Sequence, residues 1–269
     1  MLAAGVPHTP YFPRLAKDPS STVSVNFRRV AERVRAARLD ALVIFDTDHM
    51  VNFFLDTMPT FAVGTARSAD GPHELGAEIP FCTVAIAQDL ARGLLAYGVR
   101  SGFDLASCDE LKLDHSTLVP LHFTLPEMDV PIVPVFVRGI NYPLPTARRC
   151  YRLGSMLRRF VASRRSDERI GVFASGSISL EVGGPWGGRV DREWIARVCD
   201  LMREGRYAEI VRAATPAQLW RAGNIGGEIL NWIALFGVVG EARPVFVEPV
   251  VEPPDQPRDG HAYAVWELG

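Results

Sequence analysis

The sequence predicts a single α/β domain over residues 1–269, with a central mixed sheet and helices on both faces. Three observations lead to this fold class. Stretches with strand character alternate with stretches of helical spacing along the chain. The segment 41–45 is continuously apolar, which is typical of a strand covered on both faces of its sheet. The length of 269 residues and the hydrophobic fraction of 48% allow a full core to be buried.

The elements follow one another in a regular order. A helix is expected at 25–38, where Val30 and Val34 have helical spacing, and it leads into the strand at 41–45. Further strands are expected at 105–107, 132–137 and 170–174, and further helices at 84–97, 147–163, 192–203 and 226–240. The Pro- and Gly-rich segments 57–80 and 183–190 are expected to be long loops, which are often functional. The segment 249–260 is expected to be an irregular, proline-rich strap on the surface.

Composition excludes several classes of protein. A formal charge of -2, from 29 basic and 31 acidic residues, gives no electrostatic basis for binding nucleic acid. The longest apolar stretch, 229–240, is far shorter than the roughly 20 residues that span a bilayer. Residues 1–10 lack the features of a signal peptide, so we expect a soluble, cytoplasmic protein with no membrane partner. Four dispersed cysteines are expected to be reduced thiols: Cys82, Cys108, Cys150 and Cys199.

Histidines are the first candidates for chemistry. His8 lies in a backbone stiffened by prolines at positions 7 and 10. His49 comes four residues after the apolar strand 41–45, and ligands of open α/β sheets bind at the carboxyl ends of strands. His115 comes shortly before Pro120, which is expected to mark a turn. The remaining three are expected to be exposed or structural: His73, His122 and His261.

Glu228 is the other unusual residue, because it lies in an apolar stretch of Ile, Leu and Trp. Burying a carboxylate there is costly unless it is paired or bound to a cation. Two histidines and a carboxylate form the ligand set of non-haem Fe(II) oxygenases. The residues alone leave other interpretations open. Each histidine could be structural, and Glu228 could stabilise the first turn of its helix.

Several separated motifs resemble one family, the class III extradiol ring-cleavage dioxygenases. This is the family of the protocatechuate 4,5-dioxygenase β subunit and 2,3-dihydroxyphenylpropionate 1,2-dioxygenase. The segment 42–64 resembles the family's metal-site region, 7–10 its amino-terminal histidine motif, and 113–121 its second histidine motif. The segments 131–137, 141–145 and 227–232 follow in the family's order. The resemblance therefore extends along nearly the whole chain.

The resemblance implies a site and an activity. It implies that His8, His49 and Glu228 bind Fe(II) and leave one face of the metal for a diol and O₂. His115 would contact the bound substrate. The expected substrate is a small, dihydroxylated and carboxylated aromatic or heteroaromatic ring, and no organic cofactor is expected. The expected partners are a second copy of the chain or a small helical subunit.

Leu180 is a departure from the family's pattern. The family carries an acid/base histidine at this position, in a motif that here reads Ser175-Gly-Ser-Ile-Ser-Leu180. Losing a positioned acid/base typically costs about 10²–10⁴-fold in rate. Three accounts stay open. The substrate could bind already ionised, His115 or Glu181 could transfer the proton instead, or the chain could be inactive in ring cleavage.

Three further residues are candidates for the pocket, and two other functions remain open. Asn52, Thr60 and Phe61 follow His49 and are expected to line the ring pocket, although they could simply pack the loop. The segment 183–188 could be a lid or a plain turn. One rival function is a non-catalytic or impaired subunit of the same fold. The other is a hydrolase that uses the same residues with zinc.

Overall fold

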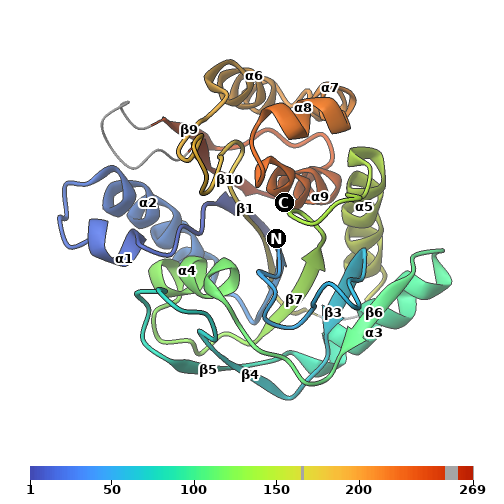
Figure 1. The fold of residues 1–269 in the computed structure, drawn as a ribbon. Coiled ribbons are helices and arrows are strands. Elements are labelled where there is room, and N and C mark those ends of the chain that lie inside the picture. The colour runs from blue at the N-terminus through green and yellow to red at the C-terminus, as the bar shows by residue number, and fades with distance from the viewer. Residues whose placement is uncertain (165–166, 252–259, 269) are drawn as a thin grey trace.

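An eight-stranded mixed sheet runs through the centre of the computed structural model, which describes residues 1–164, 167–251 and 260–268 (Figure 1). The strand order is β6-β3-β7-β2-β8-β1-β10-β9. Strands β7, β2, β8 and β1 run parallel, whereas β3 is antiparallel to β7 and β10 is antiparallel to β1. The strands are β1 (Leu2–Val6), β2 (Ala41–Asp46), β3 (Phe61–Gly64), β6 (Leu105–Cys108), β7 (Ile132–Val137), β8 (Ile170–Ser175), β9 (Phe246–Val251) and β10 (Gly260–Glu267).

Helices cover both faces of this sheet (Figure 1). Helices α2 and α4 contact each other and pack on one face, against β1, β10, β2 and β8. Helices α5 and α9 pack against each other on the other face, where α9 contacts β1, β2 and β8. The helices are α1 (Phe12–Leu15), α2 (Thr22–Ala37), α3 (Gln88–Arg100), α4 (His115–Thr124), α5 (Ala147–Ser163), α6 (Arg192–Arg203), α7 (Tyr207–Ala213), α8 (Pro216–Arg221) and α9 (Ile229–Val239). The predicted fold class, an α/β domain with a mixed sheet between helices, is confirmed.

Most of the predicted elements are present, but the region 57–97 differs. The predicted loop 57–80 contains β3 and β4 (Ser68–Gly71), and the predicted helix 84–97 begins only at Gln88. The residues before that helix form β5 (Cys82–Ala85), which pairs with β4 in a second, two-stranded sheet. The pairing with β4 is a long-range contact, and it overrides the local helical pattern.

Three more segments differ from prediction. The proline expected to mark a turn, Pro120, lies inside helix α4. Residues Gly226–Glu228 form a single 3₁₀ turn, and α9 starts only after it. The predicted strap 249–260 is a strand at both ends, because β9 continues to Val251 and β10 begins at Gly260; residues 252–259 lie outside the described residues. Within the described residues, no helix is both long and apolar enough to cross a membrane.

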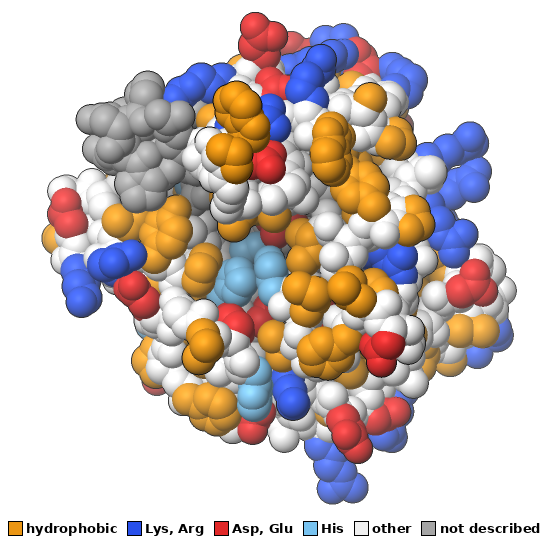
Figure 2. Space-filling model, viewed as in Figure 1, with side chains coloured by type: hydrophobic (Ala, Val, Ile, Leu, Met, Phe, Trp, Pro, Cys, Tyr) orange, Lys and Arg blue, Asp and Glu red, His pale blue; other side chains and the backbone are white. Residues whose placement is uncertain are grey.

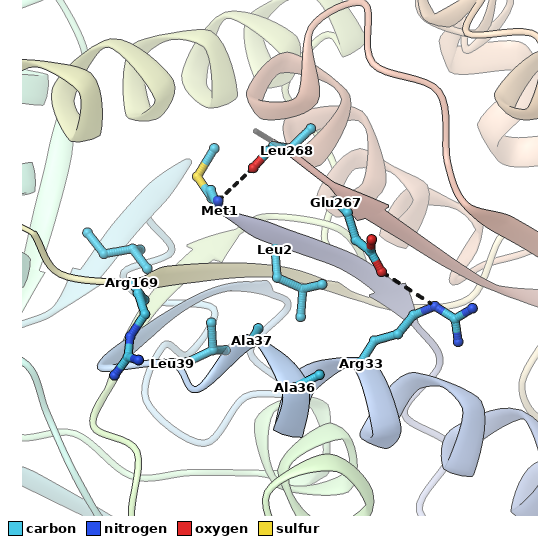
Figure 3. A pocket seen from close by; sticks show the side chains of 10 residues that line it. Met1, Leu2, Arg33, Ala36, Ala37, Leu39, Arg169, Glu267 and Leu268 are labelled. Carbon is cyan, nitrogen blue, oxygen red and sulfur yellow. Dashed lines mark hydrogen bonds and ion pairs between the residues drawn. The ribbon is translucent and has the colours of Figure 1, made fainter.

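A separate pocket of about 340 Å³ lies where strands β1 and β8 begin (Figure 3). There the amino group of Met1 donates to the carbonyl of Leu268 at 2.8 Å, and Arg33 pairs with Glu267 at 3.8 Å. Because β1 and β8 are parallel, both have their carboxyl ends at the opposite edge of the sheet. This pocket is therefore distinct from any site built on the strands' carboxyl ends.

Two glycines let α5 and α9 approach closely. A Cβ atom at Gly154 would overlap the carbonyl oxygen of Ala234, and one at Gly237 would overlap the carbonyl oxygen of Tyr151. Glycine is therefore required at the crossing of these two helices, of which α9 directly follows Glu228.

We expect Gly154→Ala to lower the free energy of unfolding by about 1–3 kcal/mol, because the added methyl group must separate the two helices. Urea denaturation would measure the loss. The matched control is Gly93→Ala in α3, where the nearest atom belongs to the side chain of Phe160 at 3.1 Å, whereas at Gly154 the added Cβ would overlap a backbone oxygen. Equal stability losses in the two variants would contradict the close-packing argument.

His261 is a buried histidine of the core. It is 1% exposed in β10, and its ring contacts those of Phe12 and Tyr263. Neither ring nitrogen has a hydrogen-bond partner in the described part of the chain. Burial lowers the pKa of His261 to about 3.

We expect this histidine to make the fold acid-sensitive. Below its unfolded pKa of about 6.5, the unfolded chain binds a proton that the folded chain excludes until pH about 3. Stability should therefore fall by about 1.4 kcal/mol per pH unit across this window. His261→Phe should remove that part of the slope in urea titrations between pH 6.5 and 4. An unchanged slope would show that the imidazole is not buried in its neutral form.

Candidate active site

Three histidines and a glutamate meet beyond the carboxyl ends of the parallel strands. His8 follows β1, His49 follows β2, and the loop after β8 lies between them. Donor atoms of His8, His49 and His115 all lie within 4.8 Å of one another. Figure 2 shows histidine side chains in a central hollow of the face seen in Figure 1. This is the edge where open α/β sheets bind ligands.

Glu228 completes the cluster from the 3₁₀ turn before α9. Its Oε1 lies 3.1 Å from Nε2 of His8 and 3.4 Å from Nε2 of His49. Its Oε2 accepts a hydrogen bond from the backbone N–H of Ser177 at 2.8 Å. Gly176 leaves the room for this side chain, since a Cβ there would lie 2.9 Å from the Cβ of Glu228. The carboxylate is fully buried.

A proline in α4 determines how His8 is held. Pro120 has no N–H, so the carbonyl of Ser116, four residues earlier, lacks its helical partner. The hydroxyl of Ser175 donates to that carbonyl. Its oxygen therefore accepts from Nδ1–H of His8, at 2.9 Å. In the neutral imidazole, Nε2 of His8 then carries a lone pair that faces Glu228.

Asp114 holds His49 in the same way. Its carboxylate lies 3.1 Å from Nδ1 of His49 and accepts the backbone N–H of that residue at 2.8 Å. The other carboxylate oxygen caps α4 by accepting the N–H of Ser116. Because an ionised carboxylate only accepts hydrogen bonds, Nδ1 of His49 carries a proton, and in the neutral imidazole Nε2 then carries the lone pair.

Glu74 holds His115 at the start of α4. Its Oε1 accepts the backbone N–H of His115 at 2.6 Å and lies 3.0 Å from Nδ1 of the same residue. The Nε2 atom of His115 is then the unprotonated nitrogen of the neutral ring. His115 lines the pocket beside His49, with ring centroids 4.2 Å apart.

The electrostatics of the cluster favour a positive charge at its centre. Burial alone would raise the pKa of Glu228, but His8 and His49 outweigh it and lower that pKa well below the usual range. Burial alone would lower the pKa of His49, yet the carboxylates of Asp114 and Glu228 hold it well above normal. Burial and the neighbouring His49 lower the pKa of His115. The site thus stabilises an anionic Glu228 beside a cation.

The donor atoms fit a divalent metal ion. Two imidazole lone pairs and a carboxylate point at one another across 3.1 and 3.4 Å, an arrangement that repels unless a proton or a cation lies between them. Ligands about 2.1 Å from a metal and at right angles to one another are about 3 Å apart. Partners on the far nitrogens of metal-binding histidines are a regular feature of such sites. His8, His49 and Glu228 could therefore hold a metal.

The cluster opens into a pocket of about 490 Å³. Leu180, the position of the expected acid/base histidine, lines this pocket and is 9% exposed. Glu181 also borders it, but its carboxylate pairs with Arg189 at 3.1 Å and accepts the N–H of Asn224. The lining residues are His8, Thr9, Pro10, Tyr11, His49, His115, Ser177, Leu180, Glu181, Val182, Gly183, Gly187, Gly188, Ile225 and Glu228.

The structure places the three residues expected to bind the ring outside this pocket. Asn52 instead links two loops, since its amide donates to Asp48 and to the carbonyl of Lys112. Phe61 is a fully buried core residue of β3, and the carbonyl of Thr60 accepts the N–H of Arg138. Their proximity to His49 in sequence does not translate into proximity to the pocket, because the chain turns away into β3.

Other predicted features are placed as follows. Three glycines of the segment 183–188 line the pocket, and its backbone closes tight turns, with Gly188 donating to the carbonyl of Glu181. His73 pairs with Asp70 at 2.7 Å, and His122 packs edge-on against Phe123. None of the four cysteines forms a disulfide.

Sequence reasoning missed the residues that orient the histidines. Asp114 precedes His115 directly, and an acidic residue before a histidine at a helix start is a usable signal of a cap. Ser175 begins the segment 175–180, in which the family carries its acid/base histidine. Glu74 lies in the segment expected to be a loop, and its partner is 41 residues away, so no local pattern could have found it.

Comparisons with known proteins assign the chain to a class. An α/β sheet with two histidines and a carboxylate at its strand ends has the donor set of metal-dependent oxygenases. The chain belongs to the family of the catalytic LigB subunit of aromatic ring-opening dioxygenases, which matches residues 2–253. The class III extradiol resemblance found in the sequence is thereby confirmed.

Relatives with assigned names agree with the family. A 2,3-dihydroxyphenylpropionate/2,3-dihydroxicinnamic acid 1,2-dioxygenase 2 of Pseudomonas putida is 35% identical over 208 residues, 74% of this chain but only 62% of that protein. A 2,3-dihydroxyphenylpropionate/2,3-dihydroxicinnamic acid 1,2-dioxygenase of Paraburkholderia xenovorans is 32% identical over 223 residues, 81% of this chain and 69% of that protein. The crystal structure of an uncharacterized protein from Escherichia coli K12 shares the fold, with a TM-score of 0.57 at 14% identity over 98% of this chain and 99% of that one.

We expect Asp114→Asn to weaken metal binding by about 10–100-fold, because the amide can no longer fix His49 with its lone pair toward Glu228. Isothermal titration with Fe(II) under nitrogen would measure the affinity. Asp191→Asn is the control, since Asp191 caps α6 in the same way without contacting a histidine of the cluster. Equal affinity in both variants would show that Asp114 serves the helix alone.

Proposed function

We propose that this protein is a non-haem Fe(II)-dependent extradiol dioxygenase that opens a small dihydroxylated aromatic ring. The observation that carries the proposal is the convergence of two imidazole lone pairs and a buried carboxylate at the floor of an open pocket. Membership of the ring-opening dioxygenase family supports it. The relatives are named for 2,3-dihydroxyphenylpropionate, a ring diol.

His8, His49 and Glu228 would hold the iron in this proposal. Fe(II), when bound, supplies the electron transfer that joins an aromatic diol to O₂. In the overall reaction one ring carbon–carbon bond next to a hydroxyl-bearing carbon breaks, and both oxygen atoms of O₂ enter the product. No external reductant is consumed. The single charge of Glu228 leaves a divalent ion with net positive charge, which suits a diol that binds as an anion.

His115 is our candidate for the proton acceptor that replaces the missing histidine at position 180. Its Nε2 is the unprotonated nitrogen and its ring lines the pocket. Glu74 keeps that tautomer by accepting from Nδ1. Glu181 is a poorer candidate, because Arg189 and Asn224 already occupy its carboxylate. Of the three accounts of Leu180, proton transfer by His115 is therefore the one we adopt.

The two rival functions differ in what supports them. A non-catalytic subunit would not need its ligand residues to converge, so their distances of 3.1 and 3.4 Å favour the enzyme. A zinc hydrolase would use the same donors, and the family assignment favours the dioxygenase over it. Pairing with a second copy or with a small helical subunit remains part of the proposal.

The test is anaerobic loading with Fe(II), followed by measurement of O₂ uptake with catechols and of the absorbance of the ring-opened product. We expect uptake equal to product formed, and its loss in His49→Ala. The control His122→Ala removes a histidine of α4 that does not line the pocket. Iron binding without O₂ uptake for any diol would favour the impaired subunit. Activity with zinc and without O₂ would favour the hydrolase.

We expect His115→Gln to lower kcat by about 10²–10⁴-fold while iron binding is retained, because the amide cannot take a proton from the diol. Iron content and kcat of the purified variant are the measurements. An unchanged kcat would mean that the substrate binds already ionised. Turnover by Leu180→His, with none by the unmodified protein, would mean that His115 does not replace the missing base.

A further inference from the structure

We infer that the pocket selects an aromatic diol whose ring substituent is apolar and uncharged. This inference rests on the proposed function and specifies its substrate class. It differs from the carboxylated ring that the sequence led us to expect. Three features of the pocket carry it: an apolar wall fixed by hydrogen bonds, a described lining without Lys or Arg, and an apolar rim.

Apolar side chains form most of the wall away from the metal ligands. Pro10 and Tyr11 come from the segment after β1, Leu180 and Val182 from the segment after β8, and Ile225 from the turn before Glu228. Leu180 is only 9% exposed although it lines the pocket. At this position the family's histidine would offer a polar group, and here the substrate meets a branched alkyl side chain.

Backbone and side-chain hydrogen bonds fix this wall. The N–H of Ile225 donates to the carbonyl of Leu180 at 3.3 Å. Asn224 clamps Val182 from both sides, accepting its N–H at 2.9 Å and donating to its carbonyl at 2.8 Å. Asn224 and Ile225 directly precede the turn that carries Glu228. The position of the apolar wall is therefore fixed relative to the proposed metal ligands.

Among the described residues, the lining away from the proposed metal ligands offers no Lys or Arg to a substrate carboxylate. The charged side chain that borders this part of the pocket, Glu181, is acidic. Arg189 lies beside Glu181 but is already engaged, because it pairs with Glu181 and donates to the carbonyl of Arg221. A carboxylate on the ring would lose its hydration against alkyl groups without gaining a partner. An alkyl or aryl substituent would gain free energy from the same burial.

The rim continues the apolar surface outward. Val182 is 53% exposed at the edge of the pocket, and Trp186 is 70% exposed on the glycine-containing segment that borders it. Figure 2 shows hydrophobic side chains on several sides of the hollow. A substituent longer than the pocket could therefore continue against apolar surface when it leaves the cavity.

The test compares two diols of equal length, 3-propylcatechol and 3-(2,3-dihydroxyphenyl)propanoate, which differ at a terminal methyl or carboxylate. We expect kcat/KM for 3-propylcatechol to be higher by roughly tenfold or more. Anaerobic titration of both diols into the Fe(II)-loaded protein should give the same order of affinity. This second comparison does not depend on turnover, so a failure of ring opening can be told apart from a failure of selectivity.

A pair of variants tests the wall directly. Val182→Arg places a cation at the edge of the pocket and should raise kcat/KM and affinity for the propanoate relative to the propylcatechol. Val182→Met, of similar length but uncharged, should not. Preference of the unmodified protein for the propanoate, in turnover or in binding, would overturn the inference and leave the dioxygenase standing. Binding without any O₂ uptake would overturn the proposed function itself.

Discussion

The buried carboxylate of Glu228 is the constraint on which the site depends. An ionised carboxylate that is fully buried costs several kcal/mol unless its oxygens are matched by donors or cations. Here one oxygen accepts the N–H of Ser177, and the other faces two imidazole nitrogens. Gly176 provides the space, and the 3₁₀ turn before α9 directs the side chain into it. A charged residue can directly precede the apolar helix α9 only because these partners compensate its charge.

Residues of helix α4 and its N-cap orient the two histidines that face Glu228. Asp114 caps the helix and also fixes His49, so one carboxylate starts the helix and sets a tautomer. Pro120 frees the carbonyl of Ser116, which Ser175 then uses to orient His8. A residue that looks like a helix breaker in the sequence thus contributes a hydrogen-bond acceptor to the site. The cap at Asp114 and the proline inside the same helix therefore direct the two imidazole nitrogens toward Glu228.

Whether a feature can be predicted from the sequence depends on how far apart in the chain the interacting residues lie. The buried strand 41–45 and the histidine after it are local patterns, and they were predicted. The resemblance to a family located His8 and Glu228, which are 220 residues apart and could not be joined by periodicity. Phe61 was expected in the pocket, but pairing of β3 between β6 and β7 draws it into the core. Glu74 was missed for the same reason, since its role exists only once distant segments meet.

Leu180 connects the chemistry of the site to its selectivity. A histidine there would need a polar surrounding, and it would present a proton donor to the substrate. Leucine at the same place extends the apolar wall that Ile225 and Val182 form. This wall offers water no hydrogen-bond partner, and an apolar surrounding strengthens the electrostatic interactions of the proposed metal ligands and of His115. Leucine at position 180 therefore both removes an acid/base group and adds apolar surface, which is why our proposal assigns proton transfer to His115, held by Glu74 on the other side of the pocket.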